Sequence, residues 1–176
     1  TGQGTLDIAF TGRLEDKDSQ GLFRQKEGGE WYAFTQFESI SARRAFPAFD
    51  EPGWKVPWTL SLTIPKAMTA VANTPMVREA AVGTEHKRVE FQTTSPLPSY
   101  LLAFGVGPFD ILDGGMAGKT PVRFITPRGR ASEATFAASL TPDILARLEN
   151  YFGMPYPFEK LDVMALPMTL SFGAME

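Results

Sequence analysis

The sequence offers few of the side chains that most often carry catalysis or bind metals. His86 is the only histidine among 176 residues, and cysteine is absent, so disulfides and thiolate chemistry are excluded. A protein zinc site needs nitrogen or sulfur ligands from several residues, and a Ser or Cys triad needs a histidine base. Because His86 lies in the polar segment 83–88, its position favours a solvated turn. The sequence therefore predicts neither a zinc site nor a histidine-based triad within itself.

Charged side chains gather in two places that could resemble active centres. The densest cluster contains Arg43, Arg44, Asp50 and Glu51. Because prolines and aromatic residues surround it, we interpret it as a rigid loop held by partly buried ion pairs rather than as an acid–base centre. Three aspartates could mimic an oxygen-ligand metal site, namely Asp110, Asp113 and Asp162. They lack the close spacing of a calcium loop, so we expect solvated loop positions.

Four sequence blocks resemble, in order, the signatures of the M1 family of zinc aminopeptidases, which are gluzincins. The first block comprises TQFE at 35–38, AR at 42–43, FPAFDEP at 46–52 and Lys55; the others are PSYLLAF at 98–104, YFGMPYP at 151–157 with KLD at 160–162, and GAME at 173–176. The last block matches the first four residues of the Gly-Ala-Met-Glu-Asn exopeptidase motif. Ala48 departs from the family, which usually has cysteine there.

The resemblance implies a mainly β fold. Residues 1–112 are expected to form part of the saddle-like antiparallel β-sandwich of the family's N-terminal domain. Residues 113–176 are expected to begin a thermolysin-like α+β catalytic domain. Because the first residue is not Met, we expect the chain to be a fragment of a longer protein.

The resemblance also assigns roles to individual residues. It implies that Glu38 and Glu176 together receive the free α-ammonium of a peptide, and that Gln36 lines the same pocket. An ammonium carries one charge and three donors, so paired carboxylates can hold and orient it. Gly173 and Ala174 are small enough to let an extended substrate pair with the backbone as an added strand. Met175 completes this substrate-binding set.

In the family, a His-Glu-x-x-His helix and a later Glu bind zinc, downstream of the exopeptidase motif. We therefore expect zinc in the full-length parent, no cofactor in this segment, and no peptide turnover by the segment alone. The expected partner is a peptide with a free amino-terminus. Two alternatives stay open: a non-catalytic M1-like scaffold that mediates protein contacts, and a separate β-sandwich binding module.

Hydrophobic periodicity predicts the elements that would position these residues. Period-two patterns or apolar runs predict strands at 6–10, 31–36, 58–64, 89–92, 100–106, 122–126 and 161–166. Gly28 and Gly29 mark a turn, and three prolines between residues 45 and 57 predict an ordered loop. Apolar residues at intervals of three and four predict a helix from Ser132 to Gly153, kinked or divided at Pro142.

Composition excludes several partners. The formal net charge is -3 and the basic residues are scattered, so nucleic acid is not expected. No apolar run reaches the ~18 residues that a membrane span needs. The sequence indicates a soluble protein but no compartment; for a bacterial source, the cytoplasm and the periplasm both fit. It does not indicate an oligomeric state.

Overall fold

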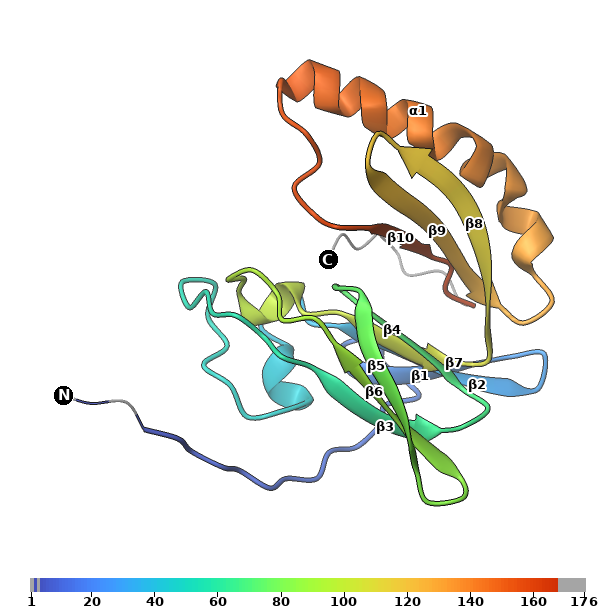
Figure 1. Cartoon of the computed structure of the whole chain (residues 1–176). Coiled ribbons are helices and arrows are strands. Elements are labelled where there is room, and N and C mark those ends of the chain that lie inside the picture. Colours follow the sequence, from blue (N-terminus) through green and yellow to red (C-terminus); the bar gives the residue numbers. More distant parts are fainter. Residues whose placement is uncertain (1, 3, 168–176) are drawn as a thin grey trace.

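The structure is a computed structural model of the chain and describes residues 2 and 4–167. Two lobes are joined by one long strand (Figure 1). The elements of the described residues, in chain order, are β1 (Gly21–Glu27), β2 (Glu30–Gln36), η1 (Ala42–Arg44), β3 (Ser61–Pro65), β4 (Thr69–Ala72), β5 (Met76–Val82), β6 (His86–Phe91), η2 (Ser99–Leu101), β7 (Phe104–Gly107), β8 (Phe109–Ala117), β9 (Thr120–Pro127), η3 (Ala131–Ala134), α1 (Thr135–Phe152) and β10 (Leu161–Met164). The predicted mainly β fold is confirmed.

The lower lobe contains a four-stranded antiparallel sheet in the order β1-β2-β7-β4. β1 and β2 form a hairpin whose turn is Gly28 and Gly29, with φ values of 57° and 87°. Two-residue hairpin turns favour positive φ at both central positions, which glycine adopts without steric cost. The turn predicted at Gly28 and Gly29 is therefore confirmed.

A second antiparallel sheet, in the order β3-β6-β5, lies beside the first in the lower lobe (Figure 1). Its inward side chains, Ile64, Val89 and Phe91, form a core cluster with Ala72 of β4. Between the two sheets in sequence, residues 47–60 form an irregular segment with a single bridge between Val56 and Leu97. The predicted proline-rich loop is confirmed.

The upper lobe contains the sheet β10-β9-β8, in which β9 pairs antiparallel with β8 and parallel with β10. α1 covers one face of this sheet (Figure 1), with Ala138 and Leu145 packed against Val122 and Phe124 of β9. The other end of β8 reaches the lower lobe, where Phe109 packs against Tyr32 of β2.

α1 is one continuous helix that contains Pro142, so the predicted division into two helices is wrong. A proline inside a helix costs about 3 kcal/mol, because its ring clashes and it donates no backbone hydrogen bond. The burial of Ala138 and Leu145 on either side of Pro142 offsets this cost. The helix ends at Gly153, as predicted, with a φ of 66°.

Of the apolar positions used to predict α1, Leu145 faces the core of the described chain, whereas the others are exposed to solvent. A ridge of residues four apart is exposed along its whole length, with exposed fractions of 76% for Phe136, 41% for Leu140, 52% for Ile144, 46% for Leu148 and 68% for Phe152. This set is called the α1 ridge below. The buried contacts of the helix come instead from Ala138 and Leu145.

Two strand predictions need correction, and four strands were missed. Residues 6–10 form no strand, and Leu6, Ile8 and Phe10 are more than half exposed, because no described strand pairs with them. The strand predicted at 100–106 begins only at Phe104, after the turn of η2. Four strands were not predicted, namely β1, β4, β5 and β8. The division of the chain at residue 112 stays a prediction; that point lies within β8.

Candidate functional site

The carboxyl end of β2 presents a buried polar side chain without a partner. Inward positions of β2 alternate, so Gln36 follows Tyr32 and Phe34 into the interior and is 2% exposed. Its amide Nε2 and Oε1 have no hydrogen-bond partner among the described residues. Leaving a buried polar group unsatisfied costs about 1–3 kcal/mol, so such a group in a folded protein requires an explanation.

Phe37 fixes the backbone at this end of the strand. It is fully buried, clusters with Ala42 and Leu102, and makes an edge contact with Phe46 at 5.6 Å between ring centroids. The carbonyl oxygen of Phe37 accepts a hydrogen bond from the Ser41 amide at 2.8 Å. The carboxylate that follows is therefore attached to an anchored segment.

Glu38 follows immediately and is exposed to solvent. Among residues 4–167 no ion pair involves Glu38, although many of the other carboxylates there have an arginine or lysine partner. The arrangement is an unpaired carboxylate two residues beyond an unpaired amide. Chemically, it can accept hydrogen bonds from a cation that approaches from solvent.

The neighbouring charge cluster is fully paired. Asp50 is 2% exposed; its Oδ2 accepts hydrogen bonds from the backbone amide and Nε of Arg43 at 2.9 and 3.2 Å, and its Oδ1 accepts one from the Ser99 hydroxyl at 2.5 Å. Arg43 also contacts Glu51 at 3.4 Å. The interpretation of this cluster as a structural loop held by ion pairs is confirmed.

The pKa of Asp50 follows from these contacts. Burial by itself would raise the pKa of this carboxyl group, but the hydrogen bonds from Ser99 and Arg43 outweigh burial and lower the pKa below its ordinary value of 3.8. Asp50 is therefore ionised at neutral pH and acts as an acceptor. A general acid would need the opposite shift.

A second buried charge cluster was not predicted. Lys160 is 8% exposed, and its Nζ donates to the backbone oxygen of Ala72 at 2.6 Å and to Oδ2 of Asp162 at 2.5 Å. Asp162 also accepts two hydrogen bonds from Arg123, at 2.8 and 2.7 Å. This set of three residues is called the junction trio below.

The prediction of loop positions for the three aspartates is wrong, because all three lie in strands, and the prediction of solvent exposure is wrong for Asp162 but right for Asp113. The Asp162 side chain is 9% exposed and ion-paired in β10. Asp110 and Asp113 lie in β8. Asp110 accepts a hydrogen bond from the backbone amide of Gly129, and Asp113 accepts one from that of Gly115. The donors to Asp162 and Asp110 lie 39 and 19 residues away in sequence, and only the fold brings them close. The spacing of the three aspartates in the sequence therefore did not reveal their partners.

Comparison with known families establishes the family to which the chain belongs. The family model of the peptidase M1 N-terminal domain matches residues 1–101, which is more than half of the chain. The chain belongs to the peptidase M1 family.

Its M1 relatives are named as aminopeptidases. Aminopeptidase M1-A of Oryza sativa subsp. japonica is 40% identical over 179 aligned residues, which cover 99% of this chain and 20% of that protein. Aminopeptidase N of Acetobacter pasteurianus is 39% identical over 142 residues, 81% of this chain and 40% of its own. Aminopeptidase 2 of Candida albicans is 35% identical over 175 residues, 97% and 19% respectively. The chain thus spans about a fifth of the length of most of these relatives.

Of the M1 residues predicted to bind substrate, Gln36 and Glu38 lie together at the end of β2. Gly173, Ala174, Met175 and Glu176 lie outside the described residues. The convergence of Glu38 and Glu176 therefore stays a prediction. No local pattern revealed the burial of Lys160, because its partner Ala72 lies 88 residues away in sequence.

The described residues do not suit the zinc ion of an M1 peptidase. Residues 4–167 contain no group of three or more His, Cys, Asp or Glu side chains that could hold a metal ion. His86 is exposed at the start of β6. No helix within the same residues has both the length and the apolar character that a membrane span requires.

Proposed function

We propose that this chain is the segment of an M1 aminopeptidase that recognises the free amino-terminus of a peptide substrate. The observation that carries the proposal is a pair of polar groups at the anchored end of β2 that have no partner among residues 4–167, the buried amide of Gln36 and the carboxylate of Glu38. Family membership and the names of the relatives support the same reading.

The chemistry of an α-ammonium fits these groups. A peptide amino-terminus brings one positive charge and three donors, and the Glu38 carboxylate accepts them without competition from an arginine or lysine of the described chain. The oxygen of the Gln36 amide can accept a further hydrogen bond. Because hydrogen bonds to charged groups contribute about 1.5–3 kcal/mol, loss of the substrate ammonium would weaken binding measurably.

Glu176 supplies the second carboxylate in this proposal, and Gly173, Ala174 and Met175 form the neighbouring backbone along which the substrate lies as an added strand. An internal residue of a peptide has no ammonium to offer. The pair Glu38 and Glu176 would therefore restrict cleavage to the first peptide bond.

The hydrolytic step is proposed to depend on zinc held elsewhere in the full-length protein. When bound, zinc supplies an activated water for attack on the peptide carbonyl. The residues of this chain bind and orient the substrate, so the 176-residue chain alone is proposed not to hydrolyse peptides. Release of amino acids by the purified chain after dialysis against a chelator would contradict this.

The test uses a full-length aminopeptidase that carries these residues. Affinities are measured by calorimetry for a dipeptide amide and for its analogue without the amino group, and their ratio is called the amine preference. Glu38→Gln should lower the amine preference at least about tenfold, equivalent to about 1.4 kcal/mol, and leave the zinc content unchanged. Glu176→Ala should remove most of kcat/KM.

Glu30→Gln is the matched control, because Glu30 lies at the opposite end of β2 and pairs with Arg128 at 2.9 Å. An unchanged amine preference in Glu38→Gln, or a loss of zinc, would contradict the assigned role. A full-length protein that binds peptides without hydrolysing them would instead support the non-catalytic scaffold.

A further inference from the structure

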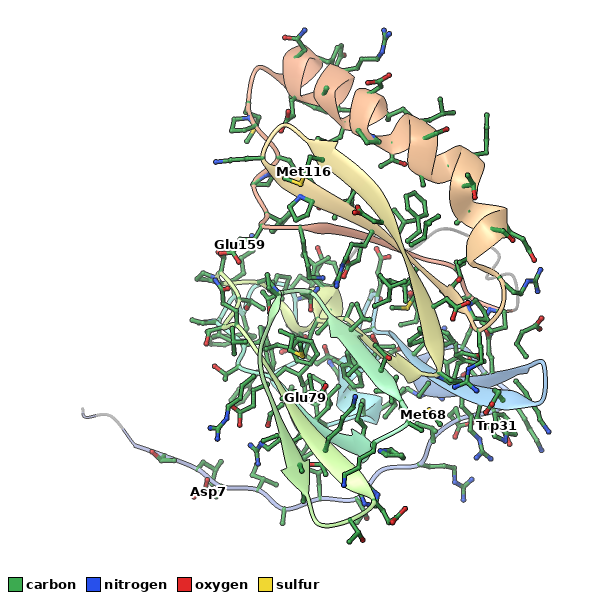
Figure 2. The ribbon with its side chains drawn as sticks, turned by 45° about the vertical axis from the view of Figure 1, so that its right-hand side comes forward. Asp7, Trp31, Met68, Glu79, Met116 and Glu159 are labelled. Carbon is green, nitrogen blue, oxygen red and sulfur yellow. The ribbon has the colours of Figure 1, made fainter. Side chains whose placement is uncertain are left out.

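The α1 helix is buried on one side only, although large apolar side chains also occupy another side of it. Ala138 and Leu145 pack against β9, whereas every side chain of the α1 ridge is at least 41% exposed. A helix at the surface of a globular protein normally carries polar residues away from its buried stripe. Figure 2 shows side chains on the outer surface of α1 that point away from the sheet, with no other described element beyond them. Residues 4–167 therefore leave a second apolar face of α1 open.

The lower lobe does not reach this face. α1 lies on the side of the β10-β9-β8 sheet that is turned away from the lower lobe (Figure 1). The junction trio connects the lobes on the side that faces the lower lobe, where Lys160 donates to the backbone oxygen of Ala72. Whatever covers the α1 ridge must therefore come from outside the described residues.

The ridge has the form that interlocks with another helix. Its members are spaced four residues apart from Phe136 to Phe152, and this length of helix extends about 24 Å. Side chains spaced in this way fit the groove between the corresponding rows of a second helix, with the two axes crossing at about −50°. Exposed polar residues, Ser139, Asp143 and Arg147, form the adjacent row on α1. An apolar centre with a polar border is typical of protein interfaces.

A lipid surface does not suit this helix. Helices that lie on membranes combine an apolar face with a polar face rich in lysine and arginine. α1 contains one basic residue, Arg147, and two acidic residues, Asp143 and Glu149. Its side chains therefore carry a net negative charge, which gives no attraction to anionic lipids. A protein partner fits the ridge better.

The lengths of the relatives indicate where that partner comes from. The alignment with Aminopeptidase M1-A of Oryza sativa covers 99% of this chain, which includes α1, but only 20% of the Oryza protein. Segments of one polypeptide meet at a high effective concentration because they are covalently joined. Soluble proteins rarely expose a large continuous apolar strip, so we expect the remainder of the polypeptide to cover it.

We propose that the α1 ridge is the docking face for a helix of the full-length aminopeptidase, contributed by the part of the polypeptide outside residues 1–176. That helix carries apolar side chains three and four residues apart and crosses α1 at about −50°. It covers Ile144 and Leu148 at the centre of the ridge. The proposal rests on the chain being a segment of a longer aminopeptidase, and it does not depend on amino-terminus recognition by Glu38.

The test measures how fast a cysteine on the ridge reacts with N-ethylmaleimide in the full-length protein. Residues 1–176 contain no cysteine, so mass spectrometry of the peptide that contains α1 reports only the introduced one. Ile144→Cys should react at least about 100-fold more slowly in the folded protein than in urea, because a covered thiol reacts only when the structure opens locally. Leu148→Cys replaces it if circular dichroism shows that Ile144→Cys does not fold.

Ala146→Cys is the matched control. Ala146 is exposed, and residues two apart in an α-helix lie about 200° apart around its axis, so this position faces away from the centre of the ridge. Its cysteine should react in the folded protein within about tenfold of its rate in urea. Equal reaction rates at residues 144 and 146 overturn the docking face, whether both cysteines react quickly or both are protected.

Photo-crosslinking identifies what covers the ridge. Phe136→p-benzoylphenylalanine keeps an aromatic side chain at a ridge position that is 76% exposed. Crosslinks to a helix outside residues 1–176 of the same molecule are expected. Crosslinks to a second molecule or to residues 1–176 overturn the proposal, as does protection of Ile144→Cys that appears only when phosphatidylglycerol vesicles are added. The amine preference of Glu38→Gln is measured separately, and its failure to change leaves the docking result standing.

Discussion

Asp50 and Gln36 are both 2% exposed and both belong to the lower lobe, yet their surroundings are opposite. Asp50 accepts hydrogen bonds from Ser99 and from Arg43, whereas neither amide atom of Gln36 meets a partner among the described residues. A satisfied buried polar group stabilises a loop, while an unsatisfied one lowers stability without benefit to the fold. The difference distinguishes Gln36 from Asp50, but Thr126 Oγ1 and Arg24 Nε also lack a described partner, so the assignment of Gln36 to a site rests on the motif as well.

The largest effect on stability is expected from Asp50→Ala in the 176-residue chain. Removing the carboxylate leaves the buried Ser99 hydroxyl and the amide of Arg43 without an acceptor, so the free energy of unfolding should fall by about 3 kcal/mol. Urea denaturation followed by circular dichroism measures this. Asp18→Ala is the matched control, because Asp18 pairs with the adjacent Arg44 at the surface. Equal losses of unfolding free energy in both variants would show that the buried hydrogen bonds of Asp50 stabilise the chain no more than a surface ion pair does.

Acidification should act on the same paired carboxylates. Burial would raise the pKa of Asp162, but the Arg123 hydrogen bonds and the Lys160 charge outweigh it, and the pKa lies below the ordinary 3.8, as it does for Asp50. The unfolded chain therefore binds more protons than the folded chain, so stability present above pH 3.8 is lost as the pH falls through the lower folded values.

Urea midpoints between pH 5 and pH 2 measure this loss. Asp162→Asn should start less stable and show a shallower decline, since one of the two buried carboxylates with a lowered pKa no longer titrates. A decline as steep as in the unsubstituted chain would assign the acid sensitivity to other carboxylates.

Gln36→Leu should have a smaller effect and the opposite sign. Leucine has a similar volume and no polar atoms, so the free energy of unfolding should stay constant or rise by about 1 kcal/mol. The amine preference of the full-length protein should fall at the same time. A clear loss of stability in urea would mean that the amide has a structural partner, and the contrast with Asp50 would disappear.

The smallest effect on stability is expected from Glu38→Gln. The side chain is exposed and has no ion pair among the described residues, so the urea midpoint should not move. Its only expected consequence is on peptide recognition. A lowered midpoint would mean that Glu38, like Asp50, stabilises the folded structure.

Sequence reasoning was most successful where one local feature decides the structure. The glycine pair predicted the β1–β2 turn, and the alternating aromatics predicted β2, because both effects act within a few residues. β1 was missed because Arg24, Gln25 and Lys26 obscure its alternation, although Gln25 is buried. Residues 6–10 had the right pattern for a strand, but a pattern cannot supply the neighbouring strand that pairing requires.

Partners distant in sequence account for the errors at the candidate site. Asp162 lies 39 residues from Arg123, and Lys160 lies 88 residues from Ala72, so only the fold brings them together. Glu38 and Gln36 were predicted from a motif resemblance, and the motif does not tell that Gln36 is enclosed while Glu38 is open to solvent. Burial of that kind depends on the packing of β1, β7 and η1 around the end of β2.

The α1 ridge has a consequence for the behaviour of the chain in solution. Five large hydrocarbon side chains face water along one side of an 18-residue helix. Sulfate, which is excluded from protein surfaces, makes exposure of such a strip more costly, so the chain should precipitate at low ammonium sulfate concentrations for its size. The double substitution Ile144→Ser and Leu148→Ser should raise the ammonium sulfate concentration at which the chain precipitates. It interrupts the apolar α1 ridge through which helices of different molecules would associate.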